Sequence, residues 1–472
     1  MKFSDNAEKR RFESVESAIG ATPMVRLNHV TADVKPAIYA KLEMMNPGGS
    51  VKDRIGISII EAYERSGDLK PGGTIVEATS GNTGVGLAMI CATRGYQSVF
   101  VMPDKMSQEK IDTLRAFGAR VVVTPTAVEP DDPRSYYSVA KRIVEETPNA
   151  VLANQYHNPA NPQSHYETTA PEIWDQSDGK VTDIVVGMGT GGTITGLARY
   201  FSDHGHQVNI VGVDPEGSIL YDAWKRSADP SGLQAETYLV EGIGEDFIPG
   251  TLDLSMVDEV VQVDDAESFQ WTRKIVREEG IFCGGSCGSA LAGAMKYAGD
   301  LDEDRLVVVI FPDSGARYLS KIFDDDWMRE HGMLPAERQP VSVREVAGSV
   351  GRTELILASP SDRVVDVIKR MREDAISQLP VVDEHHSLLG VVSEVDLLNH
   401  MLNVDHEHQP DETIEMMINR DVPRVGSTQL FEQIVPELMQ SKMVIITDES
   451  GRPEGILTMI DALEHVTRKE FS

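Results

Sequence analysis

The segment Asn46-Pro-Gly-Gly-Ser-Val-Lys-Asp-Arg54 places Lys52 after a Pro-Gly-Gly turn, where it opens a helix whose apolar pattern runs from Ile55 to Arg65. A lysine at the start of a helix is unfavourable for the helix dipole. An amine that must act as a neutral nucleophile gains from this position, because burial and positive potential both lower its pKa. The segment therefore favours a lysine prepared for Schiff-base chemistry, although an isolated lysine is usually an ordinary surface residue.

A second segment, Glu77-Ala-Thr-Ser-Gly-Asn-Thr-Gly84, lies between an apolar run at 74–76 and a helical run at 85–94. A strand, a loop of small residues and a helix in this order present backbone N–H groups and hydroxyls to an anion. The same loop could also be a simple helix-capping turn. As a binding loop it offers Thr79, Ser80 and Thr83 to a carboxylate, and Asn82 to a phenolic oxygen.

A third segment, Val185-Val-Gly-Met-Gly-Thr-Gly-Gly-Thr-Ile-Thr-Gly196, is rich in glycine and follows another strand pattern. It satisfies the G-x-G-x-x-G spacing, and Asp214 follows the next strand about 20 residues later, as in dinucleotide-binding proteins. The alternative is a phosphate-binding loop that closes on a helix N-terminus, where each charge-assisted hydrogen bond contributes roughly 1.5–3 kcal/mol. The segment alone does not decide between them. Its candidate phosphate ligands are Gly189, Thr190, Gly191, Gly192 and Thr193.

A fourth segment, Cys283-Gly-Gly-Ser-Cys-Gly-Ser289, places Ser286 on a turn flanked by glycines, where its hydroxyl could bond to a ring nitrogen. Cys283 and Cys287 are spaced as C-x-x-x-C, but the chain has only three cysteines. That number supports neither a zinc site nor a disulfide framework. We therefore expect both cysteines to be small buried residues, and we expect no metal site.

Together, these four segments resemble the fold-type II pyridoxal-phosphate enzymes, and among them most closely the cystathionine β-synthase family. The resemblance extends over residues 15–330 and includes further segments at 154–159, 213–218 and 240–249. Cysteine synthases share the lysine, the asparagine loop and the glycine-rich loop. The Gly-Gly-Ser before Val51, and Glu241 before Gly242, favour the cystathionine β-synthases. The order of the four segments also argues against the dinucleotide interpretation.

The resemblance implies an α/β fold, in which a fold-type II catalytic domain with mostly parallel sheets is followed by a pair of α+β repeats. Alternating strand and helix patterns in the first 320 residues independently predict such parallel sheets. By resemblance, pyridoxal 5'-phosphate is bound by Lys52, Asn82, the glycine-rich loop 189–193 and Ser286. Lys52 is also the implied catalytic base. The residues implied to hold the substrate carboxylate are Thr79, Ser80, Thr83 and Gln155, and those implied to lie beside the substrate are Tyr156, Gly242 and Gly244.

The implied reaction is a β-replacement by a lyase of transsulfuration and cysteine biosynthesis. The L-serine hydroxyl is replaced by L-homocysteine, which gives L-cystathionine and water. Such an enzyme could also produce hydrogen sulfide from cysteine and homocysteine. The alternatives are a cysteine synthase that uses O-acetylserine and sulfide, and a non-catalytic sensor of adenosyl ligands. The sensor is disfavoured because a competent residue occupies every cofactor position.

Composition excludes several other classes of function. The 472 residues suggest two or three domains, and the formal net charge of −31 argues against nucleic acid as a partner, because phosphates would be repelled. No stretch approaches about 18 uninterrupted apolar residues, which excludes a membrane span, and the start lacks a signal-peptide pattern. Three cysteines suit a reducing compartment. We expect a soluble, cytoplasmic protein.

The C-terminal part contains an internal repeat with a period of 65 residues. The segment Gly390-Val-Val-Ser-Glu-Val-Asp396 returns as Gly455-Ile-Leu-Thr-Met-Ile-Asp461, and each copy follows a helix and a strand pattern. This arrangement resembles a tandem pair of CBS domains, which bind adenosyl ligands in the cleft between them. We expect a catalytic domain at 1–326, a linker at 327–338, a first CBS repeat at 339–403 and a second at 404–472.

By the same resemblance, Ser393 with Asp396, and Thr458 with Asp461, would reach the ribose of S-adenosylmethionine or an adenine nucleotide. The pair could instead be a packing module with empty clefts. The negative net charge mildly favours the cationic sulfonium ligand.

Two features of animal relatives are missing from the sequence pattern. No Cys or His precedes Pro23, and the first of each are His29 and Cys91, so we expect no haem. The hairpin at 446–454 is short where animal enzymes carry an insertion used in assembly. We therefore expect a homodimer rather than a tetramer.

Overall fold

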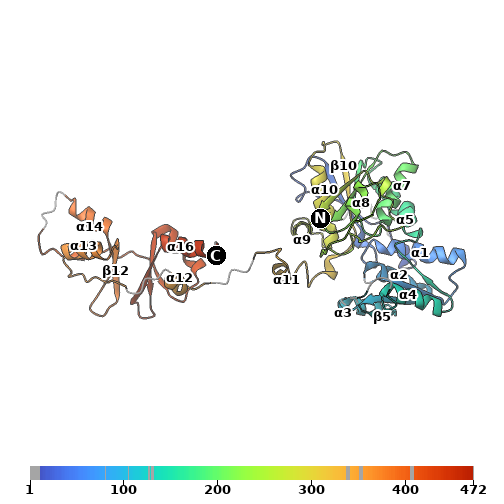
Figure 1. Ribbon diagram of the computed structural model, residues 1–472. Coiled ribbons are helices and arrows are strands. Elements are labelled where there is room, and N and C mark those ends of the chain that lie inside the picture. Colours follow the sequence, from blue (N-terminus) through green and yellow to red (C-terminus); the bar gives the residue numbers. More distant parts are fainter. Residues whose placement is uncertain are drawn as a thin grey trace. The chain divides into compact units, whose positions relative to one another are not determined.

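The apolar runs of the N-terminal part form two separate β-sheets (Figure 1). The structure, a computed structural model, describes residues 11–79, 81–104, 106–125, 128, 132–335, 341–349, 355–403 and 409–470. The chain divides into two units, residues 1–335 and 336–472. Each unit has its own sheets and its own hydrophobic cores.

The first unit contains a six-stranded sheet of order β1-β2-β10-β7-β8-β9 and a four-stranded sheet of order β5-β4-β3-β6. All neighbouring strands are parallel except β1, which is antiparallel to β2. The predicted mostly parallel sheets are therefore confirmed. The strands are β1 Met24–Arg26, β2 Ala37–Leu42, β3 Thr74–Ala78, β4 Gln97–Pro103, β5 Arg120–Thr124, β6 Ala150–Leu152, β7 Asp183–Gly187, β8 Asn209–Pro215, β9 Glu259–Val263 and β10 Leu306–Phe311.

Helices connect the parallel strands, as crossover connections require. The α-helices of this unit are α1 Lys52–Ser66, α2 Asn82–Arg94, α3 Gln108–Ala116, α4 Tyr136–Glu146, α5 Ala160–Ser164, α6 Ala170–Gln176, α7 Gly192–Asp203, α8 Leu220–Lys225, α9 Asp265–Lys274, α10 Gly285–Ala298 and α11 Asp325–Glu330. The short 3-10 helices are η1 Glu16–Ala18, η2 Glu43–Met45, η4 Leu254–Met256 and η6 Gly315–Arg317, and the π-helical segments are η3 His165–Thr169 and η5 Ile275–Glu279. Nowhere in the described ranges is a helix both long and apolar enough to cross a bilayer.

Helices bury both faces of the larger sheet. Along β10, Val307 and Val309 belong to the core that includes the side chains of α10, whereas Val308 and Ile310 belong to the core that includes α7. Successive side chains of a strand point to opposite faces, so the two cores lie on opposite sides of the sheet. A strand buried on both faces must be apolar throughout, which explains the unbroken run Leu306–Phe311.

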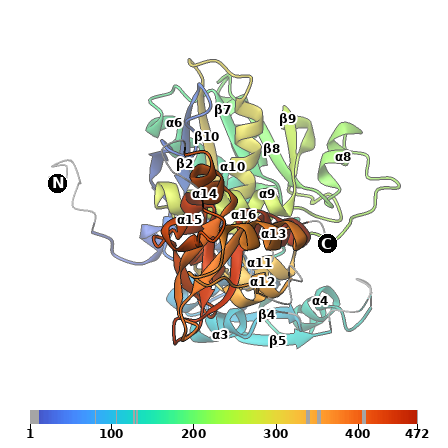
Figure 2. The same ribbon diagram turned by 90° about the vertical axis from the view of Figure 1, so that its left-hand side faces the viewer.

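The smaller sheet has the same two-sided burial. Phe100 and Met102 of β4 pack in the core that contains α1 and α2, whereas Val99 and Val101 pack in the core that contains α4. Figure 2 shows β4 and β5 beside α3 and α4, apart from the strands of the larger sheet. The candidate site lies at the carboxyl ends of strands from both sheets.

The segment predicted to begin a linker belongs instead to the first unit. Helix α11 runs over Asp325–Glu330, and Trp327 and Met328 pack with Phe269 and Tyr318. The charged residues that suggested a linker occupy the outer face of this helix, whereas its apolar residues are anchored in the core. The unit ends at Pro335, and residues 336–338 of the predicted linker lie outside the described residues.

The second unit shows the predicted repeat in three dimensions. In each copy an antiparallel hairpin leads into a helix, and the ladder has a register shift at the equivalent position, between Val381 and Val382 and between Ile446 and Thr447. The elements of this unit are α12 Val343–Ser349, α13 Val364–Glu373, β11 Gln378–Val382, β12 Leu388–Ser393, α14 Glu394–Met401, η7 Ile414–Met417, β13 Arg424–Gly426, α15 Phe431–Ser441, β14 Met443–Thr447, β15 Pro453–Thr458 and α16 Met459–Glu470.

The packing of the second unit does not follow the predicted boundary between the repeats at residue 404. Val343 and Val346 of α12 join the core of the second repeat with Phe431, whereas Ile414 and Met417 of η7 join the core of the first repeat. Each repeat thus receives an apolar segment from the sequence assigned to the other. A division by sequence order alone missed this exchange.

Candidate active site

Three strand ends of the first unit bring the candidate residues together. Strand β3 ends at Ala78, just before Thr79 and the start of α2, and β7 ends at Gly187, just before the glycine-rich loop 189–193 and α7. Strand β10 ends at Phe311 and leads to Asp313. Ligands of parallel α/β proteins bind at the carboxyl ends of strands, so this is the expected place for a site.

Lys52 is the first residue of α1, which confirms its predicted place at a helix start. The turn before it is fixed to the strand end, because the Val51 N–H donates to the Pro312 carbonyl at 2.8 Å. Burial lowers the pKa of the Lys52 amine, and the carboxylates of Asp313 and Glu245 oppose this shift. Burial therefore acts on the amine as the sequence predicted, whereas the charged groups that affect its pKa are carboxylates and do not supply the predicted positive potential.

Two glycines let α1 approach α2 closely at the level of Lys52. A Cβ atom on Gly86 would lie 2.6 Å from the Lys52 carbonyl oxygen, and a Cβ atom on Gly56 would lie 2.8 Å from the Gly86 carbonyl carbon. The two helix backbones occupy this space. The lysine thus stands on a helix whose first turn is held against α2.

The glycine-rich loop forms a cup at the N-terminus of α7. Gly191 caps the helix with φ of +83°, a conformation that favours glycine. A Cβ atom on Gly189 would lie 2.8 Å from the Gly242 carbonyl oxygen, and one on Gly192 would overlap the Asn161 amide. Backbone N–H groups at a helix N-terminus bind anions, so this cup fits a phosphate group.

His165 supports the hydroxyl of Thr193 in this cup. The ring is buried, with Nδ1 2.8 Å from Thr169 Oγ1 and Nε2 3.2 Å from Thr193 Oγ1. Burial, aided by the nearby Arg54 charge, lowers the pKa of His165 to about 3, so one ring nitrogen donates and the other accepts. The tautomer with the proton on Nε2 leaves the Thr193 O–H free to donate into the cup. Sequence reasoning did not single out His165.

Asn82 contacts a carboxylate that the sequence did not identify. Its Nδ2 donates to Asp313 Oδ2 at 2.8 Å, and the Tyr318 hydroxyl donates to the same oxygen at 2.7 Å. The other oxygen, Asp313 Oδ1, is buried without a hydrogen-bond partner among the described residues. Burial raises the pKa of Asp313, and Tyr318 and Asn82 oppose this shift. A strand end followed by a polar residue was the signal that could have marked Asp313.

Ser286 is the second residue of α10, and its side chain is buried. Cys283 and Cys287 are unpaired and buried, as predicted. Burial raises the pKa of the Cys287 thiol. Both cysteines therefore act as small core residues, Cys287 in α10 and Cys283 just before it.

The predicted substrate loops are joined by a buried acid. The Thr83 hydroxyl donates to Gln155 Oε1 at 2.6 Å, while the backbone N–H groups of Asn154 and Gln155 donate to the two carboxylate oxygens of Glu77. Glu77, which sequence reasoning did not assign, therefore links the end of β3 to the loop after β6. Thr79 is buried in the same loop, and Ser80 lies outside the described residues.

A third loop closes against the glycine cup. Gly242 and Gly244 both have positive φ, and the Gly244 N–H donates to the Met188 carbonyl at 2.6 Å. The ring of Tyr156 packs edge-on against Phe247 of this loop, with centroids 5.2 Å apart. The structure thus brings Tyr156, Gly242 and Gly244 to the neighbourhood of the cup.

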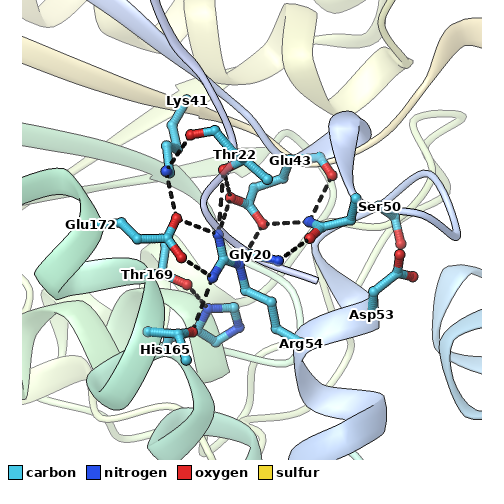
Figure 3. Close-up of polar contacts among 12 residues, drawn as sticks. Gly20, Thr22, Lys41, Glu43, Ser50, Asp53, Arg54, His165, Thr169 and Glu172 are labelled. Carbon is cyan, nitrogen blue, oxygen red and sulfur yellow. Dashed lines mark hydrogen bonds and ion pairs between the residues drawn. The ribbon is translucent and has the colours of Figure 1, made fainter. Parts of the chain in front are cut away.

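Arg54, two residues after Lys52, lies at the centre of a buried charge cluster (Figure 3). Its guanidinium binds Glu43 and also Glu172, with two contacts of 2.8 Å to the Glu172 carboxylate. Lys41 binds Glu172 at 2.7 Å, so two cations balance two anions. The Thr22 hydroxyl donates to Glu43 at 2.6 Å. The cluster ties the first turn of α1 to β2, η2 and α6.

In the second unit, the hydroxyl of each predicted ribose-binding pair contacts the aspartate of the same pair. Ser393 Oγ and Thr458 Oγ1 each lie 2.5 Å from Oδ2 of Asp396 and Asp461, respectively. The first pair is a capping box of α14, which accounts for its geometry without a ligand. A cavity of about 890 Å³ adjoins Thr458. Its polar lining is Arg344, Ser377, Gln378, Ser427, Lys442, Glu454 and Thr458.

Comparisons with known proteins match this architecture. The family model "Pyridoxal-phosphate dependent enzyme" matches residues 15–313, and the model "CBS domain" matches residues 343–403. Cystathionine beta-synthase of Mus musculus is 40% identical over 489 residues, which covers 96% of this chain and 85% of the mouse protein.

Two solved structures resemble the first unit. Cysteine synthase from Entamoeba histolytica has a TM-score of 0.63 and 33% identity, covering 72% of this chain and 96% of that one. A hydrogen sulfide-producing enzyme from Fusobacterium nucleatum has a TM-score of 0.60 and 34% identity, covering 65% of this chain and 98% of that one.

Proposed function

This chain belongs to the cystathionine β-synthase family of pyridoxal-phosphate-dependent enzymes, and from that premise we propose that it replaces the hydroxyl of L-serine by L-homocysteine, giving L-cystathionine and water. The observation that carries the proposal is the position of Lys52 at the start of α1, beside strand ends that also present the Gly189–Thr193 cup. The likeness to the mouse enzyme includes the second unit, whereas the cysteine synthase structure matches 72% of the chain.

In this proposal, the cup residues hold the phosphate of pyridoxal 5'-phosphate, and Lys52, Asn82 and Ser286 hold the rest of the cofactor. Asn82 would then exchange its contact with Asp313 for one with the cofactor. When bound, pyridoxal phosphate stabilises negative charge at the α-carbon of an amino acid. The residues proposed to hold the phosphate are Gly189, Thr190, Gly191, Gly192 and Thr193.

The chain's own residues then position the substrate and move its proton. The lowered pKa of Lys52 lets its amine take the α-proton. Thr79, Thr83 and Gln155 are proposed to bind the substrate carboxylate, because Glu77 holds their two loops together. Ser80 keeps its predicted role in this set. Gly242 and Gly244 leave room beside the cup for the substrate, with Tyr156 next to it.

The test is identification of the product with four substrate pairs, formed from L-serine or O-acetylserine and from L-homocysteine or sulfide. Cystathionine should form fastest from serine and homocysteine. Faster conversion of O-acetylserine and sulfide to cysteine would make the protein a cysteine synthase. Cysteine with homocysteine should release hydrogen sulfide as a side activity, which lead acetate detects.

For the second unit we propose an adenosyl ligand in the cavity beside Thr458, either S-adenosylmethionine or an adenine nucleotide. The repeat and the volume of the cavity support this proposal. We also propose a homodimer, because Leu398 and Leu402 near the end of α14, and Ile460 and Leu463 of α16, are exposed apolar residues. Three unpaired cysteines support a cytoplasmic location.

A further inference from the structure

The glycine cup and the predicted substrate loop come from different parts of the chain, and one buried side chain bonds to both. Asn161 is the second residue of α5. Its Nδ2 lies 2.8 Å from the Gln155 carbonyl oxygen and 3.2 Å from Thr190 Oγ1. Gln155 belongs to the loop proposed to bind the substrate carboxylate, and Thr190 belongs to the cup. The amide of Asn161 is thus shared between the two parts of the candidate site.

The partners of this amide determine which of its atoms faces them. A backbone carbonyl can only accept a hydrogen bond, so the atom that faces the Gln155 carbonyl must be the amide nitrogen. An amide nitrogen donates and does not accept, and it carries two hydrogens. It can therefore donate one hydrogen to the Gln155 carbonyl and the other to Thr190 Oγ1. The Thr190 hydroxyl is the acceptor in this contact, and it keeps its own hydrogen to donate to an anion in the cup.

The backbone of α5 is fixed by two neighbouring helices. The Ser58 hydroxyl of α1 donates to the Ala160 carbonyl at 3.1 Å. A Cβ atom on Gly196 of α7 would overlap the Pro162 carbonyl oxygen, so the backbones of α5 and α7 are in direct contact. The position of Asn161 is therefore set by helix packing as well as by its own hydrogen bonds.

A second residue, Thr251, joins the same two segments through their backbones. The Thr251 N–H donates to the Tyr156 carbonyl at 3.0 Å, and the Thr251 hydroxyl donates to the Thr190 carbonyl at 2.5 Å. These contacts can keep the loop and the cup together when the side chain at position 161 is changed. Thr251 acts on the Thr190 carbonyl, whereas Asn161 acts on the Thr190 hydroxyl.

We propose that Asn161 is a positioning residue that couples the cofactor site to the substrate site. The inference rests on the proposed function and deepens it. By donating to Thr190 Oγ1, Asn161 makes this hydroxyl a donor to the phosphate of pyridoxal 5'-phosphate. By donating to the Gln155 carbonyl, it holds the loop that binds the serine carboxylate. A phosphate that fixes the Thr190 hydroxyl therefore also steadies Gln155 through one amide group.

The first test compares the binding of pyridoxal 5'-phosphate and of pyridoxal, which lacks the phosphate, to the full-length apoenzyme. Asn161→Leu keeps the size of the side chain but forms no hydrogen bonds, whereas the carboxylate of Asn161→Asp can only accept them. Both variants should bind pyridoxal 5'-phosphate at least about tenfold more weakly than wild type, and pyridoxal within about threefold of wild type. Asn28→Asp, at an exposed amide that also donates to a backbone carbonyl, should change neither affinity.

The second test measures serine binding to holoenzyme saturated with cofactor, by the change in cofactor absorbance. Both Asn161 variants should bind serine at least about fivefold more weakly, because the Gln155 carbonyl loses its donor. The KM for serine should rise more than kcat falls, since Lys52 is unchanged. Thr190→Val should lose affinity for pyridoxal 5'-phosphate but bind serine within about threefold of wild type, which separates the two contacts of Asn161.

Hydrogen exchange of the wild-type apoenzyme tests the coupling without any substitution. Pyridoxal 5'-phosphate should slow amide exchange in residues 154–157 more than pyridoxal does. Equal protection by the two compounds would overturn the inference, and so would folded Asn161 variants that keep the wild-type preference for pyridoxal 5'-phosphate. A wild-type holoenzyme that shows this preference but does not convert serine would instead overturn the proposed function.

Discussion

Arg54 and Glu43 form a two-pronged ion pair, with Arg54 Nε 2.7 Å from Glu43 Oε2 and Arg54 Nη2 2.8 Å from Glu43 Oε1. Both side chains are inaccessible to solvent. Replacing a buried ion pair by apolar residues often costs little, but removing one partner is strongly destabilising, because it leaves an uncompensated charge. The pair therefore contributes to specifying where the first turn of α1, and with it Lys52, lies.

This ion pair predicts an acid-dependent stability. Burial alone would raise the pKa of Glu43, but Arg54, Thr22 and Lys41 together lower it from 4.5 to about 2. A lowered carboxyl pKa stabilises the folded state above the unfolded pKa, and this stability is lost as the pH falls towards the folded pKa. The shift corresponds to about 3 kcal/mol at roughly 1.4 kcal/mol per pKa unit.

Urea unfolding can measure this effect in the first unit, which contains all four tryptophans, at positions 174, 224, 271 and 327. Glu43→Gln should lower the free energy of unfolding, and its difference from wild type should shrink by about 3 kcal/mol between pH 5 and pH 2. Glu236→Gln, at an exposed position, is the control and should show no such trend. A constant difference between wild type and Glu43→Gln would contradict the prediction.

The close approach of α1 and α2 predicts a second effect. Gly86→Ala would place a methyl group 2.6 Å from the Lys52 carbonyl oxygen, a backbone atom that cannot rotate away. We expect the free energy of unfolding to fall by about 1–3 kcal/mol, because helix α1 must shift. Turnover should also fall, because Lys52 moves with its helix.

Gly299→Ala is the matched control for this substitution. Gly299 has φ of −56°, and the nearest atom to a new Cβ would be 3.6 Å away. Its stability should stay within about 0.5 kcal/mol of wild type. If urea unfolding gives Gly86→Ala and Gly299→Ala the same stability, the helices are not packed as closely as described.

Lys52→Ala should lower turnover by at least about a hundredfold and leave the fold intact. The side chain of Lys52 is not part of a hydrophobic core, so its loss removes a reactive group rather than packing. Borohydride reduction of the wild-type holoenzyme should attach the cofactor to Lys52, as seen by peptide mass spectrometry. Lys141→Ala, at an exposed lysine, should keep the label. A label on any other lysine would refute the assignment.

The site residues predicted from the sequence are those whose chemistry depends on residues that are adjacent in the sequence. Lys52 and the cup 189–193 stand in short segments where turn, glycine and helix start follow one another, so their neighbours in sequence are also their neighbours in space. The 65-residue repeat could be recognised for the same reason, because the residues of each copy follow one another in the sequence. The apolar pattern itself begins only at Ile55, because periodicity marks the apolar face of a helix and not its first turn.

The residues that were missed act across long separations in sequence. Asp313 lies 231 positions from Asn82, and Glu77 binds a loop more than 70 positions away. Glu245 stands in a segment recognised for its glycines, but its raised pKa depends on burial, then on Asp246, and also on Asp214 of strand β8. Such a carboxyl group has no signature of its own in a chain with 75 acidic residues.

The cavity of the second unit leads to a last prediction, about the charge of its ligand. The net charge of the chain favours a cationic ligand. The cavity lining, however, carries Arg344 and Lys442. These two charges would lie close to a bound ligand, whereas salt screens the more distant charges that make up the net charge. Arg344 donates to Ser427 Oγ at 2.8 Å and is 3.4 Å from Glu454, an exposed and therefore weak ion pair. Its guanidinium can turn to a phosphate, for which a charge-assisted hydrogen bond is worth roughly 1.5–3 kcal/mol.

We therefore expect the full chain to bind ADP more tightly than S-adenosylmethionine in calorimetry. Arg344→Gln should weaken ADP binding about tenfold, equal to roughly 1.4 kcal/mol, and leave S-adenosylmethionine unaffected. Arg363→Gln, an exposed arginine outside the cavity, is the matched control and should bind both ligands as wild type does. Thr458→Val should weaken both ligands, because the hydroxyl is proposed to contact the shared adenosyl part. Tighter binding of S-adenosylmethionine, with no effect of Arg344→Gln on ADP, would show that the arginine does not face the ligand.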